Sequence, residues 1–325
     1  MISIYTRAEG VVSSSSLLDD GTLPKDTVWI DLYAPTAEEE RGVERALEVE
    51  MPTHEEMREI EVSSRLYQEG GALYMTATIL AKSDTPQPEA TVVTFILVGE
   101  VLVTLRYAEP APFRTFTSRC QRQQFLRTSG EAILMGLLDA VIDRVADLLE
   151  RIGFDIDAMS SQVFEPTANG NSSGESDFKA LLRRIGRNGD LASKCRESLV
   201  SISRMLTFIT SQADLPARKD IDARIGTLSH DVQSLSDHSA FLSNKVNFLL
   251  DATLGMLNIE QTNIIKIFSV AATVFLPPTL IASIYGMNFE HMPELNWPWG
   301  YPIALLLMVA SAIAPYFYFK HKHWL

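Results

Sequence analysis

The chain has 325 residues, and its 28 Lys and Arg stand against 41 Asp and Glu, for a formal net charge of −13. This length fits about two domains or one large one, and the acidic balance excludes broad affinity for nucleic acid. An acidic chain can attract cations, although most acidic surfaces only keep a protein soluble. Two distant cysteines, Cys120 and Cys195, fit a reducing compartment and argue against a disulfide or zinc framework.

Residues 1–130 are expected to form an α/β domain. The start "MISIYTRAEG" has no apolar core, so it does not resemble a secretory signal, and we expect this domain in the cytoplasm. Thr36 and Glu39 predict a capping box that opens a helix over 36–50. Gly99 and Glu100 suggest a hairpin turn. Runs rich in β-branched and aromatic residues predict strands at 27–32, 72–80, 90–97 and 100–107.

Residues 131–220 are expected to be helical, with helices over 131–163 and 178–212 and a flexible connection at 166–177. A long stalk helix should follow over 221–266, since apolar residues recur there every seven positions. The row is Leu228, Leu235, Leu242, Leu249 and Met256. Such a helix cannot bury itself, so the preceding helices or other copies must cover it.

We find no motif of an enzyme. "HEEMR" at His54 lacks the second His of a metalloprotease helix, so we interpret it as solvated surface. The phosphate-binding loop, the nucleophile elbow and the dinucleotide fingerprint are all missing from the sequence.

Two uncharged runs, 267–289 and 295–319, end the chain, and each is long enough for one membrane helix. A buried hairpin of a soluble protein is the alternative, but Trp and Tyr gather at both ends of the pair, as at membrane interfaces. Lys266 and the basic tail 320–325 flank the runs, so both ends should be cytoplasmic. We therefore place the spans at 267–288 and 301–319, with an outward-facing loop at 289–300.

One face of the first span carries small and hydroxyl residues at spacings of three and four, namely Ser269, Ala272, Leu276, Thr279 and Ser283. Such a face indicates either helix packing or a wetted pore, and the spacing leaves both open. Pro277 and Pro278 lie in the same span, where a break often adjoins a cavity but can also be a packing kink.

The segment "YGMNFEHMPELNWPWGYP" at 285–302 resembles the signature of the CorA magnesium transporters, and the similarity extends over 245–288 and to the terminal "KHWL". The resemblance implies a homopentameric channel in the inner membrane of a bacterium, with a cytoplasmic α+β domain, a long stalk helix and a two-helix transmembrane hairpin. It implies passive uptake of Mg²⁺, also of Co²⁺ and Ni²⁺, driven by the membrane potential. It implies no cofactor, and Mg²⁺ would be both substrate and regulatory ligand.

The resemblance also assigns residues. Gly286, Met287 and Asn288 would form the selectivity filter, with Asn288 of each copy in an outer ring. The pore-lining positions would be Ser283, Thr279, Leu276, Ala272, Phe268 and Ile265, with a hydrophobic gate near Ile265, Phe268 and Leu276. Phe268 is bulkier than the Leu or Met often found there. Cytoplasmic Mg²⁺ would close the channel, with Asp84 and Asp231 as the candidate ligands.

The chemistry of the loop agrees with this role. Mg²⁺ releases its waters reluctantly, so Asn oxygens can accept hydrogen bonds from the hydrated ion where a carboxylate ring would hold it too strongly. Glu290 and Glu294 beside the filter would raise the local cation concentration. Two alternatives stay open: a zinc transporter of the related ZntB type, and a membrane-tethered scaffold whose acidic domain binds other proteins.

Overall fold

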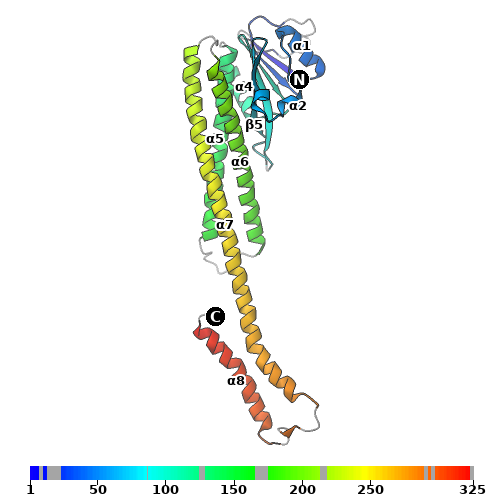
Figure 1. Ribbon diagram of the computed structural model, residues 1–325, viewed down its shortest axis with the longest axis vertical. Helices are drawn as coiled ribbons and strands as arrows, with labels where there is room; N and C mark the ends of the chain where they lie inside the picture. Colours follow the sequence, from blue (N-terminus) through cyan, green and yellow to red (C-terminus); the bar gives the residue numbers. More distant parts are fainter. Residues whose placement is uncertain are drawn as a thin grey trace. The chain divides into compact units, whose positions relative to one another are not determined.

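The computed structural model describes residues 1–6, 10–12, 23–85, 87–123, 129–164, 175–212, 218–288, 292–293 and 297–322. The chain divides into two units, Met1–Leu249 and Leu250–Leu325. The long helix α7 (Arg218–Tyr285) contributes to both of them (Figure 1).

The first unit contains a seven-stranded sheet in the order β2-β1-β3-β7-β6-β5-β4. Neighbouring strands are antiparallel except for β3 and β7, which pair in parallel. The strands are β1 (Ile2–Thr6), β2 (Gly10–Val12), β3 (Thr27–Tyr33), β4 (Leu66–Glu69), β5 (Ala72–Ala81), β6 (Glu89–Val98) and β7 (Val101–Arg106). The predicted hairpin joins β6 and β7 through Gly99, whose φ of 54° lies in the left-handed region that Gly adopts without strain.

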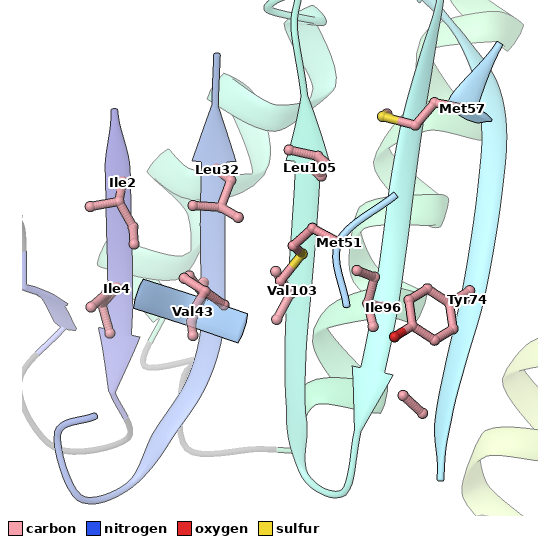
Figure 2. Close-up of a cluster of buried hydrophobic side chains, with 12 residues drawn as sticks. Ile2, Ile4, Leu32, Val43, Met51, Met57, Tyr74, Ile96, Val103 and Leu105 are labelled. Atoms are coloured by element: carbon pink, nitrogen blue, oxygen red, sulfur yellow. The ribbon is translucent and has the colours of Figure 1, made fainter. Parts of the chain in front are cut away.

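Side chains on one face of the sheet meet α1 (Ala37–Leu47) and α2 (His54–Met57). Figure 2 shows Val43 of α1 with Met51 and Met57 over this face. The sheet contributes buried residues from alternate strand positions, among them Ile2, Ile4, Ile30, Leu32, Ile96, Val103 and Leu105. Thr36 and Glu39 form the predicted capping box, in which each side chain accepts a hydrogen bond from the other residue's backbone N–H at the start of α1. This helix places Val43 in the core.

The opposite face carries an aromatic and ionic core. Trp29 stacks on Tyr5 and contacts Phe116 of α4 (Ala111–Gln123). The Asp31 carboxylate accepts two hydrogen bonds from the Arg106 guanidinium, at 3.0 and 2.8 Å, and one from the Thr104 hydroxyl at 2.8 Å. Both charged side chains are buried, so the two charges compensate each other inside the unit.

Three long helices lie side by side in the first unit: α5 (Gly130–Phe164), α6 (Glu175–Ser211) and the part of α7 before Leu249 (Figure 1). Ser239 of α7 donates a hydrogen bond to the Ala192 carbonyl of α6, and Lys245 forms an ion pair with Asp157 of α5. Leu228, Leu242 and Leu249 are buried and Met256 is exposed. The stalk helix is therefore confirmed, and the preceding helices cover its apolar row as far as Leu249.

The helices expected at 131–163 and 178–212 are α5 and α6. Residues 165–174, which include most of the connection expected to be flexible, lie outside the described residues. A short helix, α3 (Val62–Arg65), precedes β4. The second unit contains the end of α7 and α8 (Gly300–His321), both long and apolar enough to cross a membrane.

Candidate functional site

The uncharged part of α7 reaches from Ile267 to Tyr285, and that of α8 from Gly300 to Phe319. At 1.5 Å per residue each is about 30 Å long, which matches the hydrocarbon core of a bilayer. Trp297, Trp299 and Tyr301 at one end, and Tyr316 and Tyr318 at the other, are exposed and can lie in the two interfaces.

One row of this part of α7 is shielded. Its members recur at spacings of three and four and are buried or half-buried: Val270, Val274, Pro277, Ile281 and Tyr285. A matching row on α8 contains Gly300, Ala304, Met308, Ser311 and Pro315. Each row is the shielded side of its helix within the second unit, where α8 runs beside the end of α7 (Figure 1), so we infer that the two rows face each other.

The six positions expected to line a pore are all exposed: Ser283, Thr279, Leu276, Ala272, Phe268 and Ile265. All but Ile265 lie two residues from a member of the shielded row, which is about 200° around the helix. The six expected pore positions are therefore on the side of α7 away from α8. We call these six residues the exposed row.

Polar groups on the exposed row keep acceptor capacity. The Thr279 hydroxyl donates to the Phe275 carbonyl at 2.8 Å, which leaves the lone pairs of its oxygen free to accept. Further along the helix, the Thr262 hydroxyl donates to the Asn258 carbonyl at 2.7 Å in the same way. Pro277 and Pro278 lack the N–H groups that would bond the carbonyls four residues earlier, so two backbone acceptors are released near the middle of the span.

The signature tripeptide follows the end of α7 directly. The helix ends at Tyr285, earlier than the expected boundary at 288, and the Gly286 N–H donates to the Ala282 carbonyl at 3.0 Å. A Cβ at Gly286 would lie 3.2 Å from that carbonyl oxygen, so a larger residue would press on the turn. Met287 and Asn288 are exposed. Asn288 thus follows the carbonyl end of α7 by three residues, and the dipole at this end of a helix favours a cation.

Two expected residues of the loop, Glu290 and Glu294, lie outside the described residues. The two candidate regulatory acids are described. Asp84 forms an ion pair with Arg144 of α5, whose guanidinium also donates to the Ser83 hydroxyl at 3.0 and 2.9 Å. Asp231 on α7 lies 3.8 Å from the Nδ1 atom of His230.

Acids of α5 near Asp231 escaped the sequence analysis. Partial loss of solvent around Asp143, whose side chain is still 61% exposed, raises the pKa of its carboxyl; the charges of Asp139, Asp147 and Asp231 add to this effect and Arg119 opposes it. The sequence does contain a signal for this acidic cluster, because Asp139, Asp143 and Asp147 recur every four residues and so share one helix face. Within the described part of a single chain, no three His, Cys, Asp or Glu residues gather closely enough to hold a metal ion.

Comparison with known proteins places this geometry in a family. A family model described as "CorA-like Mg2+ transporter protein" matches residues 24–321. The "Magnesium transport protein CorA" of Pectobacterium atrosepticum is 36% identical over 308 residues, which is 95% of each chain. The protein of that name from Salmonella typhimurium is 37% identical over 320 residues, 98% of this chain and 96% of its own.

The fold agrees with solved structures. The complete CorA magnesium transporter from Methanocaldococcus jannaschii superposes with a TM-score of 0.73 at 17% identity, covering 100% of this chain and 98% of its own. The cytoplasmic domain of ZntB from Vibrio parahaemolyticus gives 0.51 at 7% identity and covers 79% of this chain and 97% of its own, so it shares the fold of that part. With a family model spanning nearly the whole sequence and relatives above one-third identity, this chain is a membrane protein of the CorA-like Mg²⁺ transporter family.

Proposed function

We propose that this chain is the subunit of a homopentameric channel through which Mg²⁺ enters a bacterial cell passively, with Co²⁺ and Ni²⁺ as further ions. The observation that carries the proposal is the exposed row, which lies opposite the side covered by α8 and leads to Asn288. The relatives named as magnesium transport proteins share this sequence at more than one-third identity.

The exposed row supports assembly of several copies. One helix cannot enclose a pathway, and a row that contains Ser283, Thr279 and Ala272 gains little from facing lipid. When copies surround an axis, the rows face one another and α8 of each copy lies outside. The number five comes from the resemblance to the family.

Each level of this pathway has a separate task. Five Asn288 amides would accept hydrogen bonds from the waters of a hydrated ion, assisted by the carbonyl ends of five helices. Thr279 and the carbonyls released by Pro277 and Pro278 would accept from the same waters deeper in the membrane. Ile265, Phe268 and Leu276 would form apolar rings, which close a pore by excluding water.

The membrane potential supplies the driving force. Moving one charge across 100 mV is worth about 2.3 kcal/mol, so a divalent ion gains about 4.6 kcal/mol. We place both termini in the cytoplasm of the cell and the protein in the inner membrane, because Lys266, Lys320 and Lys322 flank the spans on one side.

The proposed channel is closed by Mg²⁺ that binds on its cytoplasmic side. Asp84 and Asp231 are ligands, at subunit boundaries, for the cytoplasmic Mg²⁺ that closes the channel. In the single chain Arg144 neutralises Asp84, so Mg²⁺ must displace this guanidinium. Asp231 instead adds to the negative charge around Asp143, where a divalent ion would relieve repulsion.

The test is flux into liposomes that contain the purified full chain, with Mg²⁺, Co²⁺, Ni²⁺ and Zn²⁺ offered separately. Asn288→Ala should abolish Mg²⁺ flux and leave the oligomer intact in size-exclusion chromatography, because the hydrogen bonds to the ion's waters vanish. Normal Mg²⁺ flux in an intact oligomer would refute the filter. Flux of Zn²⁺ alone would favour the ZntB type, and no flux of any ion would favour the scaffold.

A further inference from the structure

A basic surface lies on α4, in a chain whose net charge is −13. Residues 110–129 contain four Arg and no Asp, Glu or Lys, so this stretch alone carries a charge of +4. The surface of α4 contains a depression of about 520 Å³, which is lined by Arg114, Thr115, Ser118 and Arg119. The depression is open to solvent, so a ligand there would lie on the surface and would not be enclosed.

The core of the first unit fixes how α4 presents these residues. Phe113 and Phe116 are buried and contact Phe95 and Trp29. The four lining residues are exposed and lie on the opposite side of the helix, as two pairs spaced by four positions. The backbone beneath the depression is therefore held by aromatic packing, and only the side chains remain free to adapt.

The charges of the two guanidinium groups are poorly compensated. The Arg114 guanidinium makes no hydrogen bond or ion pair with the described residues, although the Arg114 carbonyl accepts from Ser118. Arg119 lies 3.9 Å from the Asp143 carboxylate, but both side chains are more than half exposed, so solvent screens this pair. An anion in the depression would meet two planar donors, of which Arg114 is the stronger because it faces no competing acid.

Hydroxyl groups complete the lining. Thr115 and Ser118 donate to the carbonyls of Ala111 and Arg114, at 3.2 and 3.0 Å. These are local bonds along the helix, and either hydroxyl can rotate its hydrogen towards an anion instead. Guanidinium forks with adjacent hydroxyl donors match the oxygens of a phosphate group, which they can bind in bidentate fashion.

We propose that this surface of α4 binds a phosphate-bearing small molecule, either inorganic phosphate or the phosphate chain of a nucleotide. Arg114 and Arg119 hold the phosphate oxygens, and Thr115 and Ser118 donate to them. The site is separate from the exposed row, and its existence does not depend on the transport proposed above.

The test is equilibrium dialysis of radiolabelled ATP against the full chain in detergent, without Mg²⁺ and with EDTA. We expect saturable binding that inorganic phosphate displaces and adenosine does not. Arg114→Gln with Arg119→Gln should weaken binding by about tenfold or more, since each hydrogen bond to a charged group is worth at least that factor. If phosphate competes as well as ADP does, the ligand is the phosphate group alone; if ADP competes far better, it is a nucleotide.

The matched control is Arg183→Gln with Arg187→Gln, which removes two exposed arginines, also close together, from α6. The control should bind ATP like the parent, and both double variants should keep the parent's circular dichroism and oligomer size. The proposal is overturned by absent binding, by equal weakening in the control, or by adenosine that competes as well as ATP. A changed oligomer size without anion binding would also overturn it, because the arginines would then be a contact between copies.

Discussion

Arg106→Met tests the buried charge pair beneath α4. The substitution removes the two hydrogen bonds to Asp31, at 3.0 and 2.8 Å, and a third to the Ala108 carbonyl at 2.9 Å. The Asp31 carboxylate, only 6% exposed, then keeps the Thr104 hydroxyl as its one hydrogen-bond donor among the described residues. Leaving such a charge uncompensated costs about 3–5 kcal/mol of unfolding free energy.

Thermal unfolding of the purified full chain at pH 7, followed by circular dichroism, measures this cost. For a unit of this size 1 kcal/mol corresponds to about 2–4 °C, so the melting temperature should fall by roughly 6–20 °C. Lys82→Met is the control, since Lys82 pairs with Glu89 at 2.9 Å and both side chains are more than half exposed. That exposed pair should contribute at most about 1 kcal/mol.

Two outcomes would refute the reasoning. One is an equal fall in melting temperature in Arg106→Met and Lys82→Met, which would mean that burial does not determine how much an ion pair contributes to stability. The other concerns Asp31→Leu added to Arg106→Met, which removes the stranded carboxylate and should restore much of the loss. A further loss in the double variant would show that Asp31 contributes through other contacts.

Three other predictions concern charge. Glu290→Gln with Glu294→Gln should weaken the apparent affinity for Mg²⁺ in uptake assays. The effect should fade at high salt, because salt screens the attraction of the two carboxylates for the ion. A loss of affinity that does not depend on salt would indicate direct coordination or misfolding. Asp84→Ala with Asp231→Ala should reduce inhibition by internal Mg²⁺ at fixed external Mg²⁺, and unchanged inhibition would exclude these ligands. Burial raises the pKa of Glu131 above its ordinary value near 4.5, so ionisation of Glu131 costs stability as the pH rises through and above that value. The melting temperature of Glu131→Gln minus that of the parent should therefore be larger at pH 8 than at pH 4. A smaller difference at pH 8 would contradict the raised pKa of Glu131.

Local signals in the sequence predicted much of the first unit. Thr36 and Glu39 satisfy each other's backbone within one turn, so the start of α1 depends on nothing distant. The turn at Gly99 likewise needs only neighbouring residues. The parallel pairing of β3 with β7 joins segments about 70 residues apart, and no local pattern specifies it. The same limit explains why α4, whose Phe113 and Phe116 face the sheet, escaped prediction.

The membrane part shows a similar division. Periodicity placed Thr279 and Ser283 on one face of the span, but could not tell packing from a pore, because both faces contain small or apolar residues. The position of α8 distinguishes the two faces, since it shields the row of Val270 and leaves the other exposed. The buried pair of Asp31 and Arg106 left only a faint signal, a charge within each of two apolar strands.

The exposed row also has a consequence for how mutations are inherited. Its six side chains are exposed in the single chain, so substitutions there should alter monomer stability little and pass cellular quality control. A defective subunit would mature, insert and join normal ones. In the homopentamer proposed above, one faulty copy would occupy a pathway shared by all five. Inactivating alleles at these positions should then be dominant over a normal copy of the gene, whereas alleles that strongly destabilise the core around Arg106 should be recessive, because fewer of their products fold and assemble.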